Sequence, residues 1–438
     1  MICFEESNPL VRLLKEDNGI ESLTPACPGT SRRMTMKKQL LLLLCSIPLL
    51  FAALAGCSTP QVRNTSAEDN PEHHYLVGMN ALDNGKFAIA KEKFERAVYL
   101  NERYAKGYAG LAIASAEKAK RQEDAGFRQV EIKNVFAALD KADKYADTPA
   151  EEFCNCVAQI RVQTLLKEDG WLDEAQQSFT VGNRLKINQL DLPYYQGTEA
   201  LSYFMGVAYL EGLEFQKARD AFAAVLNSSR DGKWNQKADA GWKKTDRIVR
   251  AMAGITVGNI GKQIATQDSV SRADLAALLV DEVKLDTLFA GRIPVNSDAK
   301  RVAEFTPVDV LYSPFKDEVL TTMKWKVRGL EPKFDEATRS YLFYPAENVS
   351  RGEMAFILED VLIKMVGDEK LASAYFGQDK SPFPDVRNTS PLFNAVMNMT
   401  TRGIMEGELS GEFRPNDPVD GADALLAVRV LSQRINIH

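Results

Sequence analysis

The side chains that most often carry out catalysis are sparse in this chain, and their spacing matches no catalytic motif. The 438 residues contain only three histidines, which are His73, His74 and His438. The sequence has no GxSxG elbow, no phosphate-binding glycine loop and no cluster with metal-ligand spacing. Paired acids such as Glu151-Glu152 and Glu359-Asp360 have the spacing of a solvated helix face. Because the commonest general base is scarce, we expect a protein that is not an enzyme and that uses no metal or cofactor.

One cysteine, Cys57, lies where an apolar segment changes abruptly to a polar one. The apolar run 40–54 follows two lysines and is shorter than the roughly 20 apolar residues that a membrane-spanning helix needs. A basic start before a short apolar run predicts a signal peptide over residues 34–56. Since a signal peptide begins at its methionine, we expect residues 1–33 to be a start-site miscall.

The segment Leu54-Ala55-Gly56-Cys57 resembles the lipobox of bacterial lipoproteins. In that family the cysteine thiol receives a diacylglycerol, so the resemblance implies that Cys57 is the lipidation site. Ser58, rather than Asp, after the cysteine implies export to the outer membrane. We therefore expect a lipid anchor there, a lipidated linker over residues 57–70 and a domain that faces the periplasm. An ordinary cleaved signal peptide or a buried Cys57 is the alternative.

Composition indicates a globular protein whose partners are protein or polysaccharide. The chain is 45% hydrophobic and 26% charged. Its 54 basic residues are balanced by 60 acidic ones, so it lacks the excess of basic charge that is typical of proteins that bind nucleic acid. After the predicted cleavage, Cys154 and Cys156 are the cysteines besides Cys57. On a helix their side chains diverge by about 200°, so we interpret them as two small helix residues rather than as a disulfide.

The first half of the predicted mature chain, residues 71–232, contains a recurring helical pattern that resembles tetratricopeptide repeats. The clearest copy has its matching residues at Gly78, Gly85, Phe87, Ala90, Phe94 and Ala97. The second clear copy has them at Gly206, Tyr209, Phe215, Ala218 and Phe222. The start of a weaker copy is matched by Tyr108 and Leu111, and a further weak copy ends with Gly170, Ala175 and Phe179. In the first weak copy we expect the second helix near residues 135–145, displaced by a charged insertion at 118–133.

Stacked helical hairpins form a curved array whose concave surface usually holds a peptide or a protein. We therefore expect residues 71–232 to bind an unidentified protein partner. The alternative is that the array only spaces the second domain from the membrane.

The second half, residues 233–438, ends in a segment that resembles an S-layer homology domain. The matching residues are Phe383, Pro384, Asp385, Val386, Gly403, Ile404, Gly407, Gly411, Phe413, Pro415 and Val419. Similar segments occur earlier in the chain and indicate three copies, at about 233–283, 305–364 and 381–433. The resemblance implies a pseudo-threefold prism of helical hairpins, so the predicted fold class is all-α, a tetratricopeptide-type solenoid followed by this domain.

Helix capping explains much of the second-half motif without any ligand. Ser271-x-x-Asp274 and Ser350-x-x-Glu353 are capping boxes ahead of apolar helices, and Asp420-x-x-Asp423 is a close substitute. The apolar side chains two residues before the loop Thr or Pro are expected to fill the core; they are Ile264, Phe343 and Phe413.

The predicted ligand contacts come from the resemblance. In S-layer homology domains the arginine of the TRAE motif binds anionic groups of cell-wall polymer, and Arg272 and Arg351 occupy that position. A guanidinium suits carboxylate or phosphate through its planar donor fork. The rest of the predicted wall-polymer set is Asp309, Asp385, Gly258 and Gly407.

The third copy departs from the family pattern. Gly421 replaces the arginine, and Pro391 or Leu392 stands where the family often has a tryptophan. We therefore expect at most two grooves to keep ligand chemistry, with direct or modified peptidoglycan as the target rather than a pyruvylated polymer.

These features predict an outer-membrane lipoprotein that tethers the envelope to the cell wall while its helical repeats scaffold a protein. The alternative is a periplasmic assembly factor whose second domain is a protein interface without wall binding.

Overall fold

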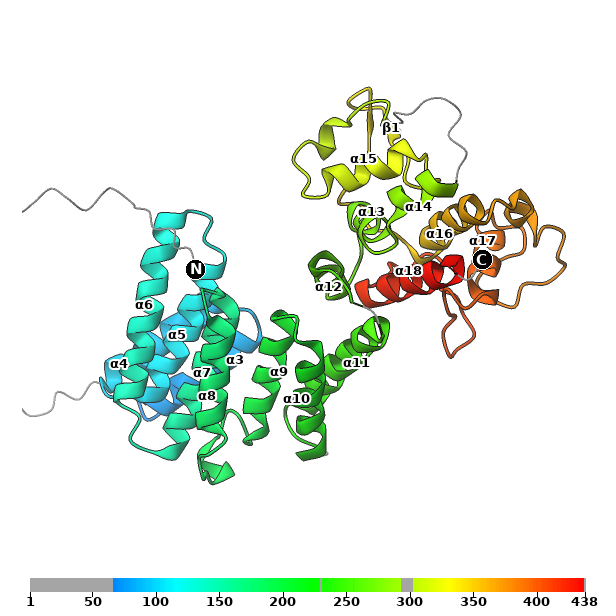
Figure 1. The fold of residues 1–438 in the computed structure, drawn as a ribbon. Helices are drawn as coiled ribbons and strands as arrows, with labels where there is room; N and C mark the ends of the chain where they lie inside the picture. The colour runs from blue at the N-terminus through cyan, green and yellow to red at the C-terminus, as the bar shows by residue number, and fades with distance from the viewer. Residues whose placement is uncertain (1–65, 229–230, 255, 293–301, 437–438) are drawn as a thin grey trace, which may run out of the picture. The chain divides into compact units, whose positions relative to one another are not determined.

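The computed structural model describes residues 66–228, 231–254, 256–292 and 302–436. The predictions for Cys57 and for the leader lie outside these residues. The described chain is mainly helical, in agreement with the all-α prediction (Figure 1). Its described strands form one short antiparallel hairpin, β1 (Lys333–Asp335) with β2 (Ser340–Leu342).

The first half consists of consecutive helices joined by short turns. They are α3 (Pro71–Asp83), α4 (Phe87–Leu100), α5 (Ala105–Lys120), α6 (Ala125–Lys144), α7 (Pro149–Leu166), α8 (Trp171–Gly182), α9 (Glu199–Glu211) and α10 (Phe215–Ser228). A 3₁₀ turn, η1 (Gln189–Asp191), lies between α8 and α9. Helices α3 and α4, α5 and α6, α7 and α8, and α9 and α10 pack in pairs.

Glycines let neighbouring helices approach a central phenylalanine in this half. The ring of Phe94 on α4 is fully buried. A Cβ at Gly78 would lie 2.6 Å from that ring, and one at Gly110 on the next hairpin would lie 2.3 Å from it. Phe222 on α10 is enclosed in the same way by Gly206 and Gly241. The first helices of successive hairpins therefore close on one aromatic side chain from both sides.

The prediction of a charged insertion at residues 118–133 is wrong. Helix α6 already begins at Ala125, because the side chain of Asp124 accepts a hydrogen bond from the Phe127 N–H (2.9 Å) and caps the helix. Ile132 and Val135 are buried on one face of this helix, whereas Lys133 between them is exposed on the helix surface.

Helix α11 (Asn235–Met252) contributes to two hydrophobic cores. Trp234, just before the helix, and Ala238 belong to the core of the first half, whereas Ile248 and Ala251 belong to the core of the second half. The indole N–H of Trp234 donates to the Tyr195 carbonyl at 2.8 Å. The predicted boundary at residue 233 thus falls at a helix that both halves share.

The second half is built from shorter helices and loops. They are α12 (Asn259–Ala265), α13 (Arg272–Asp281), α14 (Leu285–Arg292), η2 (Val308–Val310), α15 (Lys316–Lys324), α16 (Arg351–Val366), η3 (Glu369–Ser373), α17 (Phe393–Thr401) and α18 (Gly421–Asn436). Helix α15 packs on α13, α17 on α16, and α11 on α18. The first helix of each predicted copy therefore packs on the second helix of another copy, in a cycle.

Three loops meet at the centre of this cycle through backbone hydrogen bonds. The N–H of Val270 donates to the carbonyl of Val419 (2.9 Å), that of Val349 to Val270 (2.9 Å), and that of Val419 to Val349 (3.1 Å). All three valines are buried. The next residue of two loops, Ser271 and Ser350, caps α13 and α16 through the predicted capping boxes.

The prediction that Glu359 and Asp360 lie on a solvated face is wrong, because both are buried. One carboxylate oxygen of Glu359 accepts from the side-chain amides of Asn394 and Asn398, each at 2.6 Å. Asp360 accepts from the backbone and side chain of Arg328 at 2.9 and 2.8 Å. Burial raises the pKa of Glu359. These acids join α16 to α17 and to the turn before β1.

Gly110→Ala should destabilise the first half, because the added methyl group would overlap the Phe94 ring. Overpacking costs about 1–3 kcal/mol, which exceeds the helix propensity that alanine adds. Urea unfolding should show a lower midpoint. Gly291→Ala on α14 is the matched control, since no atom lies within 4 Å of its added methyl. An unchanged midpoint for Gly110→Ala would contradict this packing.

Candidate wall-polymer groove

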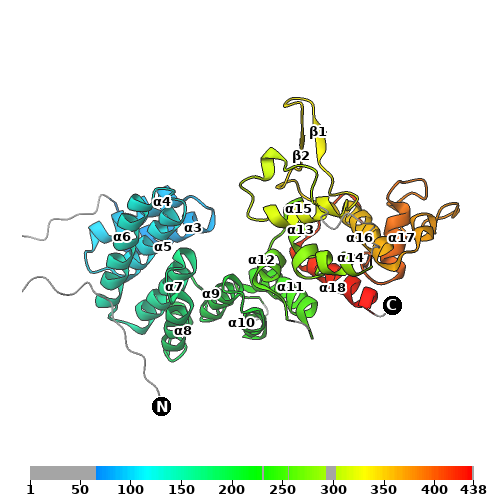
Figure 2. The same cartoon turned by 45° about the horizontal axis from the view of Figure 1, so that its top comes forward.

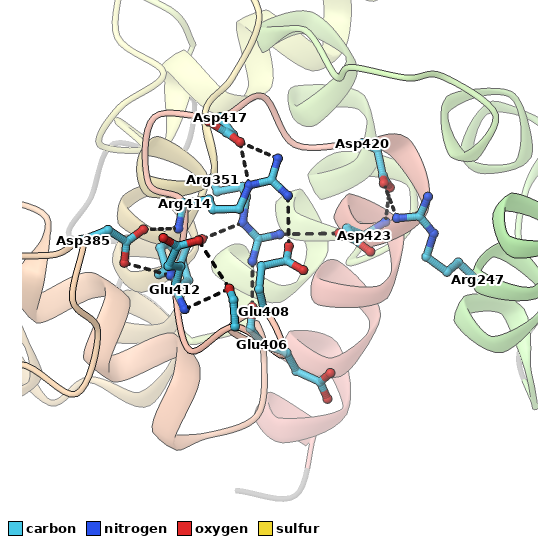
Figure 3. Close-up of polar contacts among 12 residues, drawn as sticks. Arg247, Arg351, Asp385, Glu406, Glu408, Glu412, Arg414, Asp417, Asp420 and Asp423 are labelled. Carbon is cyan, nitrogen blue, oxygen red and sulfur yellow. Dashed lines mark hydrogen bonds and ion pairs between the residues drawn. The ribbon is translucent and has the colours of Figure 1, made fainter. Parts of the chain in front are cut away.

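The two predicted arginines are held in closely similar sockets. Arg351 begins α16 and is 7% exposed. Its Nε donates to the Phe413 carbonyl at 2.9 Å and its Nη2 to the Glu406 carbonyl at 2.6 Å (Figure 3). The guanidinium lies 5.1 Å from the centre of the Phe413 ring. Asp423 of α18 approaches Nη1 at 3.4 Å.

Arg272, at the start of α13, repeats this arrangement with 5% exposure. Its Nε donates to the Phe343 carbonyl at 2.9 Å, and its guanidinium lies 4.8 Å from the Phe343 ring centre. Its two terminal nitrogens donate to the carbonyls of Gly329 and Glu331 at 2.7 and 2.9 Å. Burial lowers its pKa, and the carboxylate of Glu347 opposes that shift. Both guanidinium groups therefore fasten a loop of the next copy, with most of their surface covered.

The predicted aspartates hold the same loops from the other side. Asp385 accepts from the backbone N–H of Phe413 (2.9 Å) and from that of Arg414 (2.6 Å), which Figure 3 labels beside it. Asp309 accepts from Phe343 (3.1 Å) and Tyr344 (2.7 Å). Arg414 and Tyr344 have φ values of 58° and 56°, in the left-handed region that side chains disfavour. The aspartates thus stabilise the turns that present Phe413 and Phe343 to the arginines.

The predicted glycines lie at packing contacts. Gly258 donates its N–H to the Glu282 carboxylate at 3.1 Å. A Cβ at Gly407 would lie 2.9 Å from the Phe383 ring. The close Phe383 ring explains the small residue at Gly407 without a ligand.

A groove of about 360 Å³ opens beside Arg351. Its walls come from the loop 403–409, from α18 and from α11, which contributes Arg247 and Arg250. The side chains of Arg247 and Arg250 are 44% and 68% exposed. Arg247 donates to Asp420 at 2.7 Å, and Arg250 lies 3.1 Å from Asp246. Sequence reasoning missed both, although their spacing of three places them on one face of α11.

Carboxylates line the same groove. Glu406 and Glu408 lie on its loop and Asp423 on α18. Burial, with the neighbouring carboxylate of Asp420, raises the pKa of Asp423. Glu408 approaches Arg414 at 3.4 Å. The groove thus presents both signs of charge within one concave surface.

The third position, Gly421, has no room for a side chain. A Cβ there would lie 1.7 Å from the carbonyl oxygen of Ile264 at the end of α12. The Gly421 N–H donates to the Gln267 carbonyl at 3.0 Å. The backbone of the first copy therefore occupies the volume that an arginine fills in the other two sockets, which gives the physical reason for the departure seen in the sequence.

Within residues 66–436 and outside the gaps, no group of three or more His, Cys, Asp or Glu is arranged to hold a metal ion. No helix in the described part of the chain is long and apolar enough to span a membrane.

Cys154 and Cys156 are buried free thiols, and burial raises the pKa of both, to about 12 for Cys154 and about 11 for Cys156.

Residues 382–425 match the family model of the S-layer homology domain. The matched segment contains Asp385, the groove loop 403–409 and the start of α18. Comparison with curated proteins and with solved structures found no match. The C-terminal region therefore contains an S-layer homology domain, a module that indicates attachment to the cell envelope.

Gly421→Arg restores the residue that the other copies carry, yet it should destabilise the protein by about 3 kcal/mol or more, because no rotamer avoids the Ile264 carbonyl. Thermal unfolding should show a lower Tm. Leu409→Arg adds the same charge at a fully exposed side chain of the neighbouring loop and should leave the Tm unchanged. Equal Tm values for the two variants would show that the third socket is open.

Proposed function

We propose that this protein is a non-enzymatic outer-membrane lipoprotein whose C-terminal domain binds peptidoglycan through the groove beside Arg351. The observation that carries the proposal is the S-layer homology match over residues 382–425, which includes one wall of that groove. The lipid at Cys57 holds one end of the chain in the membrane. The other end then holds the wall.

The charges of the groove favour peptidoglycan over a polyanionic wall polymer. The guanidinium groups of Arg247 and Arg250 each pair with an aspartate of the protein, yet they are exposed enough to accept a carboxylate of a ligand as a further partner. Glu406 and Glu408 on the facing loop would repel a polymer with repeated negative charge. Peptidoglycan stem peptides carry both amino and carboxyl groups. A groove with both signs of charge is complementary to such a ligand.

Arg351 contributes to this function by positioning the groove. It fastens the following loop through the backbone carbonyls of Phe413 and Glu406, so the loop that carries Glu406 and Glu408 keeps its shape. Arg272 holds the corresponding loop before Phe343 in the same way. Ligand contact in this proposal falls chiefly to the exposed arginines of α11. Arg351 adds its positive charge at the base of the groove.

The helical hairpins of residues 71–232 scaffold a protein partner in this proposal. Two attachments on one chain, the lipid and the wall groove, raise the effective concentration of wall near the membrane. A partner held by the hairpins would be confined to the same space. Weak binding at the groove is therefore sufficient for a stable tether.

A second candidate function is a periplasmic assembly factor without wall binding. It is favoured by the arginines of the first two sockets, which are satisfied by the protein's own carbonyls, and by Gly421 in the third. In that case the groove on the second half would receive a protein segment.

Arg247→Gln combined with Arg250→Gln should reduce pelleting with washed peptidoglycan sacculi about tenfold at low salt. The change removes two exposed donors and leaves the buried sockets intact, so the fold should persist. The assay uses the chain from residue 58 onward and measures the pelleted fraction against protein concentration.

Lys237→Gln with Lys243→Gln is the matched control, because it removes the same charge from α11 outside the groove lining. Control pelleting should equal that of the wild type. If the wild type stays in the supernatant, the wall-binding proposal fails and the assembly-factor function is favoured. If both double variants pellet like the wild type, the groove is not the wall contact.

A further inference from the structure

The hairpin of β1 and β2 carries exposed aromatic rings that the fold does not need. Phe334 and Tyr341 face each other across the two strands, with ring centres 5.3 Å apart. Phe305 lies 6.3 Å from Tyr341. These three residues, called the aromatic cluster, are 43% to 55% exposed. Figure 2 shows the hairpin projecting from the rest of the C-terminal half.

The hairpin is an addition to its copy. The segment from Gly329 to Phe343 is four residues longer than the corresponding segment from Gly403 to Phe413. The core residue of this segment, Phe343, is fully buried without help from the cluster. On the solvent side of a two-stranded hairpin polar residues are the norm, so adjacent exposed aromatic rings indicate a contact surface.

The hairpin stands at the rim of the Arg272 socket. It runs between Glu331 and Phe343, whose carbonyls both accept hydrogen bonds from the Arg272 guanidinium. The hairpin therefore belongs to the loop that Arg272 fastens, which is the counterpart of the loop that Arg351 fastens beside the groove.

Charged groups of both signs lie beside the cluster, and four of them form ion pairs within the protein. Lys333 pairs with Glu347 at 2.6 Å, and Lys326 pairs with Glu304 at 2.9 Å. The Asp335 carboxylate accepts from Thr338 and Tyr344, which lowers its pKa. A surface of aromatic faces with balanced charge around it suits an uncharged ligand that has both apolar faces and hydroxyl groups.

We propose that the aromatic cluster stacks against sugar rings of a peptidoglycan glycan strand. The negative faces of Phe334 and Tyr341 attract the weakly positive C–H groups on the flat side of a pyranose ring. This inference rests on the proposed wall-binding function and assigns to the hairpin the recognition of the glycan, whereas the groove recognises the stem peptide.

A protein partner fits the cluster less well. Three half-exposed aromatic side chains offer roughly 300 Å² of surface. A stable protein interface needs about 800 Å² on each partner. A single glycan strand of peptidoglycan matches this smaller contact area.

The test measures binding of peptide-free glycan strands, released from sacculi by an amidase, to the chain from residue 58 onward. Phe334→Ser with Tyr341→Ser should weaken this binding about tenfold. Phe334→Tyr with Tyr341→Phe keeps both rings and should bind like the wild type. Phe127→Ser with Phe376→Ser removes two other exposed rings and is the matched control. Far-UV circular dichroism checks that each variant is folded.

The outcomes separate this inference from the proposed function. Equal glycan affinity in wild type and Phe334→Ser/Tyr341→Ser would overturn the stacking proposal. So would a wild type that pellets with sacculi but does not bind glycan strands, although wall binding itself would then stand. If the wild type binds neither, both proposals fail. Sedimentation velocity adds one more check, because a change of oligomeric state in the variant would identify the cluster as a protein interface instead.

Discussion

A closed cycle of three peptide hydrogen bonds, among Val270, Val349 and Val419, is the constraint on which the C-terminal half depends. Each valine lies two residues before the first residue of a helix, so α13, α16 and α18 all start near one buried point. Because the first helix of each copy packs on the second helix of another, no copy completes a core alone. Helix α11 closes the cycle by packing on α18.

The cycle also determines which positions are able to contact a ligand. Where the loop of the next copy leaves space beside the first residue of the helix, an arginine fills that space and donates to carbonyls of the loop. Arg272 and Arg351 do this. Where α12 brings the Ile264 carbonyl directly against the helix start, only glycine fits. Exposed donors then come from outside the motif, from Arg247 and Arg250 on α11. Structural and binding roles are thus divided between buried and exposed arginines.

Local signals in the sequence predicted much of the fold, because they act over a few residues. The capping boxes at Ser271 and Ser350 formed as expected, and Phe343 and Phe413 are buried as expected. Long-range partners were not predictable. Glu359 is buried because two asparagines 35 and 39 residues later donate to it, and no spacing along α16 reveals that. The groove was missed for the same reason, since Arg250 and the loop 403–409 are far apart in the chain.

Amide hydrogen exchange with and without soluble muropeptides locates the wall fragment on the folded chain and so tests whether it binds in the groove beside Arg351. We expect slower exchange in the loop 403–409 and in the first turns of α18, with no change in α3 to α6. Protection of those four helices with an unaffected loop 403–409 would contradict this expectation, since the wall fragment would then lie on the helical hairpins and not in the groove beside Arg351.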